Sequence, residues 1–571
     1  MLRGRPPFAV GAAGFFWWML APAGVALAFS PILGNGFVNW DDFGNIVRNP
    51  WLGRFDLPAW RWMWTTTHYG HFQPLAWLSL SLDRVFWGLE PGGWHLTALA
   101  IHAGSSVVLF FLLREFLQVP GFSGKDDDFG AAASAAFSAL LWSVHPLRVE
   151  VVAWATERRE LLATLFSLLS VHSYFRCVRE NRTRPSMGGA LAYFIAACLS
   201  KITAAMLPFC LTALDLWILG RGWKIREKRW FWAVSAVVLV LGVHAQTLSG
   251  TSVPFAIFGP LDRLAQALYG PGYYGLKTFW PANLSPFVYV DWRAEVSRYW
   301  PIAALSVLLG AGGARIARAR PGARALGVIL AATLIASLGF FKSGPQTAAD
   351  RFVHMPSTAA AGLLAWALCR IPRRLRSTMI VAAALTAVVF IGISRGQCLI
   401  WRDSITLWER AAQGPAPNPL VLQNLAGALR EAQREAEASA VYERLMTADP
   451  ASPVVLALTG DARYASQDYA QAVAFYARAL EGRLHLPTVR VNMGLALYRL
   501  GRREEAELAF AEAARQDPLN ADAWHNLGIT LAASGRLEKA RFALGNALHL
   551  QPSRADSREA LRKLPPLIKL Q

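Results

Sequence analysis

A series of long apolar runs in the first 400 residues constrains the fold of this chain more than any other feature. A helix needs about 20 consecutive apolar residues to cross the hydrocarbon core of a bilayer. About eleven runs approach this length, and the shorter ones need protein neighbours around them. Their approximate bounds are 8–33, 94–117, 129–147, 160–177, 187–200, 203–219, 230–249, 299–314, 324–341, 356–371 and 377–394. We therefore expect a polytopic membrane domain of about 11 helical spans.

The composition differs between the two parts of the chain. Overall, 54% of the residues are hydrophobic and only 17% are charged, whereas soluble proteins average about 25% charged residues. Residues 1–400 contain 36 Lys or Arg, 19 Asp or Glu and 20 of the 23 Trp, while residues 401–571 contain 21 basic and 19 acidic residues. This distribution excludes an ordinary cytosolic enzyme and a disordered chain, and it predicts a membrane domain followed by a soluble one. The basic residues lie in short loops, so we expect membrane lipids and no nucleic acid as partners.

The basic residues also predict a topology. Four clusters, in residues 176–184, 221–229, 315–324 and 370–376, fall in alternate loops, and such loops are typically cytoplasmic. The first run follows Arg3 and is longer than the apolar region of a signal peptide, so we expect a retained span with a cytoplasmic N-terminus. An odd number of spans then puts residues 395–571 on the extracytoplasmic face. We expect a multi-pass protein, and the compact form suggests a bacterial inner membrane.

The C-terminal part contains an internal repeat of 34 residues. Small residues recur at Ala426, Gly460, Gly494 and Gly528, and again at Ala438, Ala472, Ala506 and Ala540. This spacing is typical of tetratricopeptide repeats, in which small residues lie where paired helices cross. We expect an all-α protein with a membrane domain (1–400), a linker (401–415) and a repeat domain (416–571) of four repeats plus a C-terminal helix (554–563). Such arrays bind a peptide or protein on a concave surface, and a spacer or a dimerisation surface is the alternative.

Two adjacent carboxylates, Asp41 and Asp42, follow the first span directly. Neighbouring carboxylates suit base catalysis, because one can be ionised while the other is protonated or binds a hydroxyl. The alternative is a solvated acidic turn or a helix cap. Lys201 lies alone between two short apolar runs, where it can meet a lipid phosphate or extend its amine to the membrane surface. Arg351 occurs in another outer loop, and Arg is a natural bidentate clamp for phosphate.

The predicted second outer turn is also rich in charge. Residues 145–150 read His-Pro-Leu-Arg-Val-Glu, and residues 157–160 read Glu-Arg-Arg-Glu. This pattern indicates either the polar wall of a cavity or an ion-paired helix cap. Walker-type phosphate loops, GxSxG nucleophile elbows and HExxH zinc helices do not occur in the sequence, and its five Cys show no CxxC spacing that favours a metal. Chemistry on a lipid-linked anionic donor accounts for this set most economically.

The motifs, taken in order, resemble a known family. They are Asn39-Trp40-Asp41-Asp42, residues 145–150, residues 157–162, Ser200-Lys201, residues 280–285, residues 349–352 and residues 401–404, followed by the repeats. This set is similar to the transmembrane and tetratricopeptide-repeat O-mannosyltransferases and their bacterial relatives, in the GT-C superfamily of glycosyltransferases. The resemblance covers essentially the whole chain.

The resemblance implies a metal-independent, inverting transfer of a sugar such as mannose from a polyprenyl phosphate to a protein hydroxyl, without a cofactor or bound metal. Asp41 would be the general base, and Asp42 would assist it or bind the acceptor. Arg351, Lys201 and Arg158 would hold the donor phosphate, and the repeats would present the acceptor protein. The residues implied in the pocket are His145, Arg148, Glu150, Glu160 and Gln73. Gln73 stands where the family commonly has Arg, and Glu160 stands where it usually has Asp.

Two other functions remain as alternatives. The first is a membrane-anchored repeat scaffold that organises an envelope complex without catalysis. The second is a transporter or flippase of lipid-linked sugars, which needs charged residues at the membrane midplane. The sequence places most of its charges at the predicted outer edge instead, so we rank the transporter last.

Overall fold

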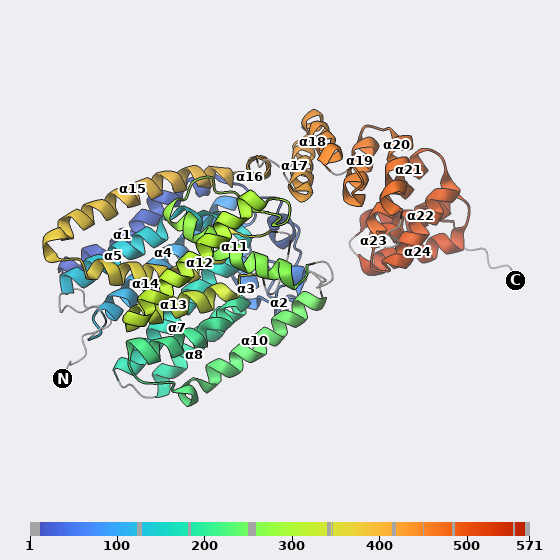
Figure 1. The fold of residues 1–571 in the computed structure, drawn as a ribbon. Coiled ribbons are helices and arrows are strands. Elements are labelled where there is room, and N and C mark those ends of the chain that lie inside the picture. The colour runs from blue at the N-terminus through green and yellow to red at the C-terminus, as the bar shows by residue number, and fades with distance from the viewer. Residues whose placement is uncertain are drawn as a thin grey trace. The chain divides into compact units, whose positions relative to one another are not determined.

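The computed structural model describes residues 12–120, 122, 128–180, 184–248, 258–339, 344, 346–413, 418–448, 450–481, 486–551 and 554–565. The described residues form helices joined by turns and irregular segments, with one isolated β-bridge between Val288 and Ala348. The chain divides into two compact units, Met1–Ala411 and Ala412–Gln571. The expected all-α fold is therefore confirmed (Figure 1).

The first unit is a bundle of helices of unequal length. Four helices, α2, α6, α9 and α16, have fewer than ten residues, and several 3₁₀ or π turns connect the longer ones. The helices are α1 (Ala12–Phe29), α2 (Leu57–Thr65), α3 (Pro74–Trp87), α4 (Pro91–Leu117), α5 (Asp128–Ser143), α6 (Val149–Ala153), α7 (Arg158–Arg179), α8 (Arg184–Ser200), α9 (Leu207–Ala213), α10 (Arg229–Leu248), α11 (Pro260–Phe279), α12 (Val296–Ala319), α13 (Pro321–Ile335), α14 (Pro356–Cys369), α15 (Arg376–Ile400) and α16 (Ser404–Ala411).

Six stretches of the described chain are helical, long and apolar enough to cross a membrane: Phe16–Gly34, Pro91–Leu117, Ala155–Arg179, Ile225–Thr247, Val296–Ala319 and Arg373–Ile400. Four further apolar helices are shorter, namely Met187–Ser200, Ile202–Ile218, Pro321–Ile335 and Pro356–Cys369. The predicted count of about 11 spans is therefore not confirmed. The apolar runs are present, but turns divide several of them into helices of fewer than 18 residues. The chain is a multi-pass membrane protein.

α5 lies at the centre of the bundle and packs against α1, α4, α14 and α15. Its buried alanines, among them Ala131, Ala135 and Ala139, recur every fourth residue. Small side chains let helix backbones approach closely in a membrane. In Figure 1, α15 runs along the edge of the bundle beside α1 and α5. This arrangement brings the end of α15 back to the start of the first long loop.

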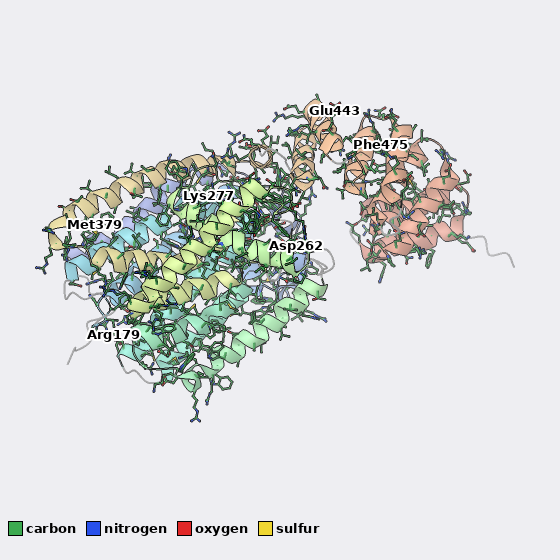
Figure 2. All side chains as sticks on the ribbon, in the orientation of Figure 1. Arg179, Asp262, Lys277, Met379, Glu443 and Phe475 are labelled. Atoms are coloured by element: carbon green, nitrogen blue, oxygen red, sulfur yellow. The ribbon has the colours of Figure 1, made fainter. Side chains whose placement is uncertain are left out.

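The polar and the basic ends of α7 are far apart. Its N-terminal turn carries Arg158, Arg159 and Glu160, and its last turn carries Arg176 and Arg179. A helix of 22 residues spans about 33 Å at a rise of 1.5 Å per residue. Figure 2 shows Arg179 at the opposite side of the unit from Lys277. Residues 181–183 of the first predicted basic cluster lie outside the described residues.

The second unit contains four helix pairs and a last helix. They are α17/α18 (Pro419–Glu431, Glu435–Ala448), α19/α20 (Pro453–Ala465, Tyr469–Leu480), α21/α22 (Pro487–Arg499, Arg503–Gln516), α23/α24 (Ala521–Ala533, Leu537–Leu550) and α25 (Ala555–Lys563). A Cβ atom at Gly460 would lie 2.6 Å from the Tyr476 ring, and one at Gly494 would lie 2.7 Å from the Phe510 ring. The repeated small residues therefore lie where the two helices of a pair touch.

Candidate active site

Asp42 anchors the loop that follows α1. Its Oδ1 accepts hydrogen bonds from the backbone N–H (3.0 Å) and the hydroxyl (2.6 Å) of Thr156, and its Oδ2 accepts one from the Val38 N–H (3.1 Å). Burial raises the pKa of Asp42 to about 6, against the pull of these donors. Both carboxylate oxygens of Asp42 thus accept hydrogen bonds from the protein. The two from Thr156 join the acidic loop to the 3₁₀ turn Ala155–Glu157 (η5) ahead of α7.

Asp41 has a different environment from its neighbour. Within the described part of the chain, no hydrogen bond to its carboxylate is present, and its side chain is only partly covered. Burial raises the pKa of Asp41, and the nearby cations Arg159 and Arg351 oppose this rise. A carboxylate that has no hydrogen-bond partner in the described residues, a raised pKa and two cations nearby can accept a proton from a substrate hydroxyl.

Glu157 is the centre of an ion cluster beside Asp41. Arg159 donates to Glu157 Oε1 from Nη2 (2.6 Å) and Nε (3.1 Å). Lys201 Nζ lies 3.2 Å from Glu157 Oε2 and 2.8 Å from Glu160 Oε2. A lysine has three donors, and within the part of the chain that the structure describes only two are used. Lys201 therefore keeps one N–H for an anion, and its side chain is 15% exposed.

Arg351 is the third cation of this cluster. Glu150 accepts both the Arg351 backbone N–H (3.0 Å) and a side-chain N–H of its guanidinium, and Gln346 Oε1 accepts Nη2 (2.6 Å). The guanidinium carbon lies 5.7 Å from the Trp40 ring centroid and 5.4 Å from that of Trp154. Three segments far apart in the sequence thus hold this arginine in one orientation against Trp40, the residue before Asp41.

Asp350, the residue before Arg351, is buried among tyrosines. The Tyr273 hydroxyl of α11 donates to Asp350 Oδ1 (3.2 Å), and the Ala349 N–H donates to the Tyr274 hydroxyl (3.3 Å). Burial, with the nearby charge of Glu150, raises the pKa of Asp350 to about 8. When Asp350 is protonated and neutral, Glu150 carries the only negative charge of these two carboxyl groups, and this charge pairs with Arg351.

Three of the predicted site residues are engaged elsewhere. Arg158 is fully buried, pairs with Asp83 (2.7 Å) and donates to the Trp94 carbonyl (2.9 Å). The structure therefore does not bring Arg158 into the cluster, and its neighbour Arg159 occupies that place. Arg148 Nη1 holds the Ser357 hydroxyl (2.6 Å) and two backbone carbonyls of residues 353 and 354.

His145 caps a turn. Its Nδ1 accepts the Leu147 N–H (3.2 Å), and its Nε2 contacts the Thr278 carbonyl at 3.0 Å. The first bond leaves Nδ1 unprotonated, so Nε2 carries the hydrogen and the ring is neutral. His145 and Arg148 therefore support the walls of the site, while Glu150, Glu160, Lys201 and Arg351 lie in the cluster itself.

The segment before α3 contributes Gln73, which the resemblance implied, and two residues that the sequence interpretation missed, His71 and Tyr69. Gln73 is buried, and its Oε1 has no hydrogen-bond partner among the described residues. His71 lies in the field of the cluster: burial and then Arg159 lower its pKa well below the usual range, so its ring is neutral. Tyr69 is 48% exposed and has a left-handed backbone with φ of 51°.

Tyr69 also lies close to the acidic loop. A Cβ at Gly44 would meet the Tyr69 hydroxyl, so any other residue there would require the Tyr69 ring to move. Burial and the charge of Asp41 raise the pKa of Tyr69. Strained, exposed residues of this kind cluster at functional sites. The left-handed tyrosine gave no signal in the sequence, because its backbone conformation is determined by the packing of two distant loops.

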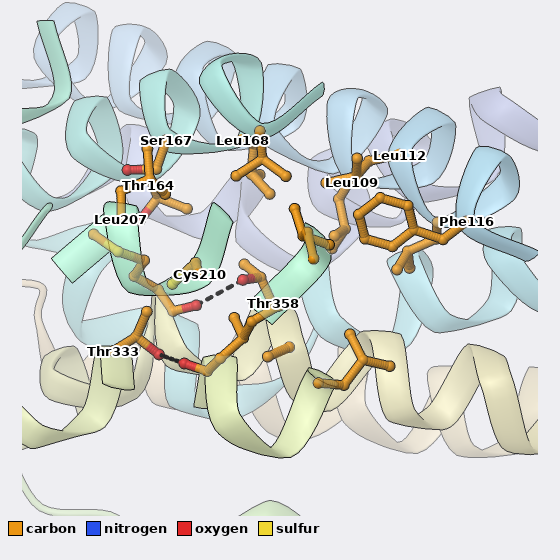
Figure 3. Close-up of a pocket in the computed structure, with 17 residues that line it drawn as sticks. Leu109, Leu112, Phe116, Thr164, Ser167, Leu168, Leu207, Cys210, Thr333 and Thr358 are labelled. Carbon is orange, nitrogen blue, oxygen red and sulfur yellow. Dashed lines mark hydrogen bonds between the residues drawn. The ribbon is translucent and has the colours of Figure 1, made fainter. Parts of the chain in front are cut away.

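An apolar pocket lies between the helices that continue from the cluster (Figure 3). Its cavity volume is about 60 Å³, and part of it is open at the surface. Its walls include Thr164 and Ser167 of α7, Cys210 of α9 and Thr358 of α14, and most of the other lining residues are aliphatic. On α7, Thr164 lies one turn after Glu160, on the same helix face.

The described residues contain no group of three or more His, Cys, Asp or Glu side chains that could hold a metal ion. The carboxylates of the cluster are paired with cations instead, as the Glu157 and Glu150 contacts show.

Comparisons with known proteins are consistent with both units. Human protein O-mannosyl-transferase TMTC4 is 28% identical over 176 residues, which cover 29% of this chain and 24% of the human protein. The chain is similar to the TMTC protein O-mannosyl-transferases. Mouse TMTC4 is 22% identical over 497 residues, covering 75% of this chain and 66% of the mouse protein. The alignments thus span between about a quarter and two thirds of these relatives.

The repeats have their own matches. A tetratricopeptide-repeat family profile matches residues 491–557. Among solved structures, the TPR domain of Arabidopsis OM64 is similar, with 25% sequence identity and a TM-score of 0.20; the match covers 20% of this chain and 96% of that domain. The prediction of a TMTC-like chain with tetratricopeptide repeats is confirmed by these relatives and by the repeat profile.

Proposed function

We propose that this protein is an integral-membrane glycosyltransferase. It moves a sugar, such as mannose, from a polyprenyl-phosphate donor to a hydroxyl of an acceptor protein. The observation that carries the proposal is the environment of Asp41: a carboxylate without a hydrogen bond in the described residues, on which the charges of Arg159, Arg351 and Glu157 act. The relatives named O-mannosyl-transferases support the same reaction class.

The donor phosphate binds to the cations of the cluster. Lys201 retains an unused N–H, and Arg351 and Arg159 each have further guanidinium donors. Preorganised cations stabilise charge that develops on a leaving phosphate. Arg159 takes the role that the sequence had given to Arg158, because Arg158 is paired with Asp83.

The apolar pocket supports a lipid-linked donor. Its walls come from α4, α7, α9, α13 and α14, and three of these helices, α7, α9 and α14, each follow one member of the cluster: Glu157, Lys201 and Arg351 respectively. Thr333 and Thr358 donate their hydroxyls to carbonyls of their own helices (2.8 Å each), so the wall that they form is apolar (Figure 3). An isoprenoid chain suits such a surface, while its phosphate stays at the charged end.

The reaction is a single displacement. The acceptor oxygen attacks the anomeric carbon of the sugar, the bond from that carbon to the phosphate oxygen breaks, and polyprenyl phosphate leaves with the electron pair. Asp41 takes the proton from the acceptor hydroxyl. Asp42 does not share this role, since its oxygens accept three hydrogen bonds from the protein. One inversion at the anomeric carbon follows.

The proposed orientation follows the charge distribution. Arg176 and Arg179 end α7, and the proposed site is at its start. With the basic ends in the cytoplasm, the site faces the extracytoplasmic side. The repeat unit then binds the acceptor protein on that side.

The test is a transfer assay with purified, detergent-solubilised protein. Labelled polyprenyl-phosphate mannose and glucose are each supplied with an extracytoplasmic protein extract. We expect label in protein with at least one donor, and loss of most of this label in Arg351→Lys, which keeps the charge but not the guanidinium fork. If neither donor binds or gives label, the proposal fails and the non-catalytic scaffold becomes the better account.

A further inference from the structure

We propose that Ser404 and Trp408, on the short helix after the last long apolar helix, are positioning residues for the loop that carries Asp41. This inference rests on the proposed function, because it takes Asp41 as the base. The two residues lie more than 360 positions from Asp41 in the sequence, in a segment that the sequence analysis predicted as a linker and to which it assigned no role in the site.

Two hydrogen bonds join α16 to the acidic loop. The Asn39 N–H donates to the Ser404 hydroxyl (2.8 Å), and Trp408 Nε1–H donates to the Asn39 side-chain oxygen (2.6 Å). A third contact lies just before them, where the Gly36 N–H donates to the Arg402 carbonyl (2.8 Å). Asn39 is therefore held at its backbone and at its side chain, two residues before Asp41.

The residue between Asn39 and Asp41 is held by aromatic rings. The Trp40 ring stacks on Trp154, with centroids 4.8 Å apart, and contacts Trp408 at 5.0 Å. Trp401 lies parallel to it at 6.3 Å. Aromatic pairs at these distances are worth about 0.5–1.5 kcal/mol each beyond their buried area. Trp40 is thus fixed between the η5 side of the bundle and the segment that begins α16.

Asp41 itself has no comparable anchor. Its carboxylate has no hydrogen bond in the described residues, so its orientation depends on its neighbours. Asp42 is held on one side by Thr156 and Val38. Asn39 and Trp40 are held on the other side by α16. The geometry therefore requires both anchors to keep the Asp41 carboxylate facing Arg159 and Arg351.

α16 is rigid enough to serve as an anchor. Asp403 Oδ1 accepts the Thr406 N–H (2.8 Å) and caps the start of the helix. Leu407 and Trp408 are fully buried. A buried tryptophan with a satisfied N–H is a well-ordered group, and its removal affects the loop that it touches.

The test uses Ser404→Ala, Trp408→Phe and the double variant in the full chain. Each single change removes one hydrogen bond to Asn39 and keeps most of the packing. The matched controls are Trp366→Phe and Ser235→Ala, which remove similar bonds to the carbonyls of Phe122 (3.1 Å) and Ala205 (2.8 Å). Neither of these two hydrogen bonds involves a residue of the acidic loop.

We expect kcat of the double variant to fall at least tenfold, while KM for the donor changes by less than twofold. A loosened loop also lets water reach Asp41, so the acid limb of the pH–rate profile should move to lower pH. Ser404→Thr keeps the hydroxyl, so its kcat should return to the wild-type value that Ser404→Ala loses. The controls should match the wild type. An unchanged kcat and pH profile in the double variant would overturn the inference, and so would an equal loss in the controls.

Amide hydrogen exchange separates this inference from the proposed function. In the double variant, the amides of residues 36–46 should exchange at least tenfold faster, while those of α5 remain protected. This readout needs no transferase activity. If the wild type transfers no sugar, the proposed function fails, and the exchange of this loop still tests the anchor. Unchanged exchange in residues 36–46 would overturn the inference by itself.

Discussion

Replacing each residue of the acidic pair by asparagine separates catalysis from loop anchoring. Asp41→Asn removes the proposed base and no hydrogen bond seen in the described residues. General-base catalysis contributes about 10²–10⁴-fold to a rate, which corresponds to about 3–5 kcal/mol of barrier. We therefore expect Asp41→Asn to lose at least a hundredfold in kcat. Its thermal stability should stay the same or rise, because a carboxylate whose pKa is raised by burial is removed.

Asp42→Asn should lower thermal stability more than it lowers kcat. The asparagine oxygen can still accept from Thr156, but its NH₂ group then faces the Val38 N–H, which now bonds to Oδ2 (3.1 Å). A buried donor left without an acceptor costs about 1–3 kcal/mol. We expect a lower unfolding temperature, measured in detergent, together with a moderate loss of rate. If Asp42→Asn abolishes transfer at unchanged stability and Asp41→Asn remains active, the assignment of the two roles is wrong.

Four further results are expected. Because burial raises the pKa of Asp41 and a base acts in its ionised form, kcat should decline on acidification at a pH above the usual carboxylate range near 4; a rate that is constant down to pH 4 contradicts this. Lys201→Met removes the ion partner of the buried Glu160, while Glu157 keeps Arg159, so it should destabilise the first unit by about 3–5 kcal/mol, more at pH 8 than at pH 5; an unchanged unfolding temperature argues against the cluster. Thr164→Leu narrows the apolar pocket and should raise KM for a long-chain donor but not for a short-chain analogue; an equal effect on both would remove the pocket from the donor site. Gly494→Leu forces a side chain against the Phe510 ring, 2.7 Å from its Cβ position, so the repeats should lose about 1–3 kcal/mol while donor binding is unchanged; wild-type exchange protection in residues 486–551 would contradict the helix-pair packing.

The repeat unit was predictable because its spacing reflects direct contacts. Each glycine of the 34-residue pattern faces a large side chain of the paired helix, as Gly460 faces Tyr476. The short distance between the two helix backbones leaves room only for a small side chain at such a position, so the 34-residue spacing is visible in the sequence. The long apolar runs were predictable for a similar reason, since hydrocarbon admits few polar groups. The number of spans was not, because apolar composition does not reveal where a turn interrupts a run.

The site was only partly predictable. Acidic and basic residues at the edge of the membrane domain were apparent, but their pairing was not. Arg158 and Arg159 are adjacent, and successive residues of a helix point about 100° apart. Only the packing shows that the first meets Asp83 and the second meets Glu157. The sequence showed Glu157 only as part of a charged turn. Its place at the centre of the ion cluster depends on Lys201, which lies 44 residues away in the sequence.

The aromatic contacts were hidden for another reason. The Trp residues of the first part were expected at membrane interfaces, as is common. The structure instead stacks Trp40 against Trp154 and Trp401 beside the acidic pair. No local pattern joins these three residues, because they come from three separate loops. They meet only after the bundle has folded.

The measurement that tests the central claim most directly is a single-turnover experiment. Wild-type and Asp41→Asn protein are first loaded with labelled polyprenyl-phosphate sugar, bound donor is quantified, and acceptor protein is then added. The account predicts that both proteins bind the donor equally and that only the wild type transfers label to the acceptor within the time of one turnover. Equal transfer by both proteins, or transfer by neither once the donor is bound, would contradict it.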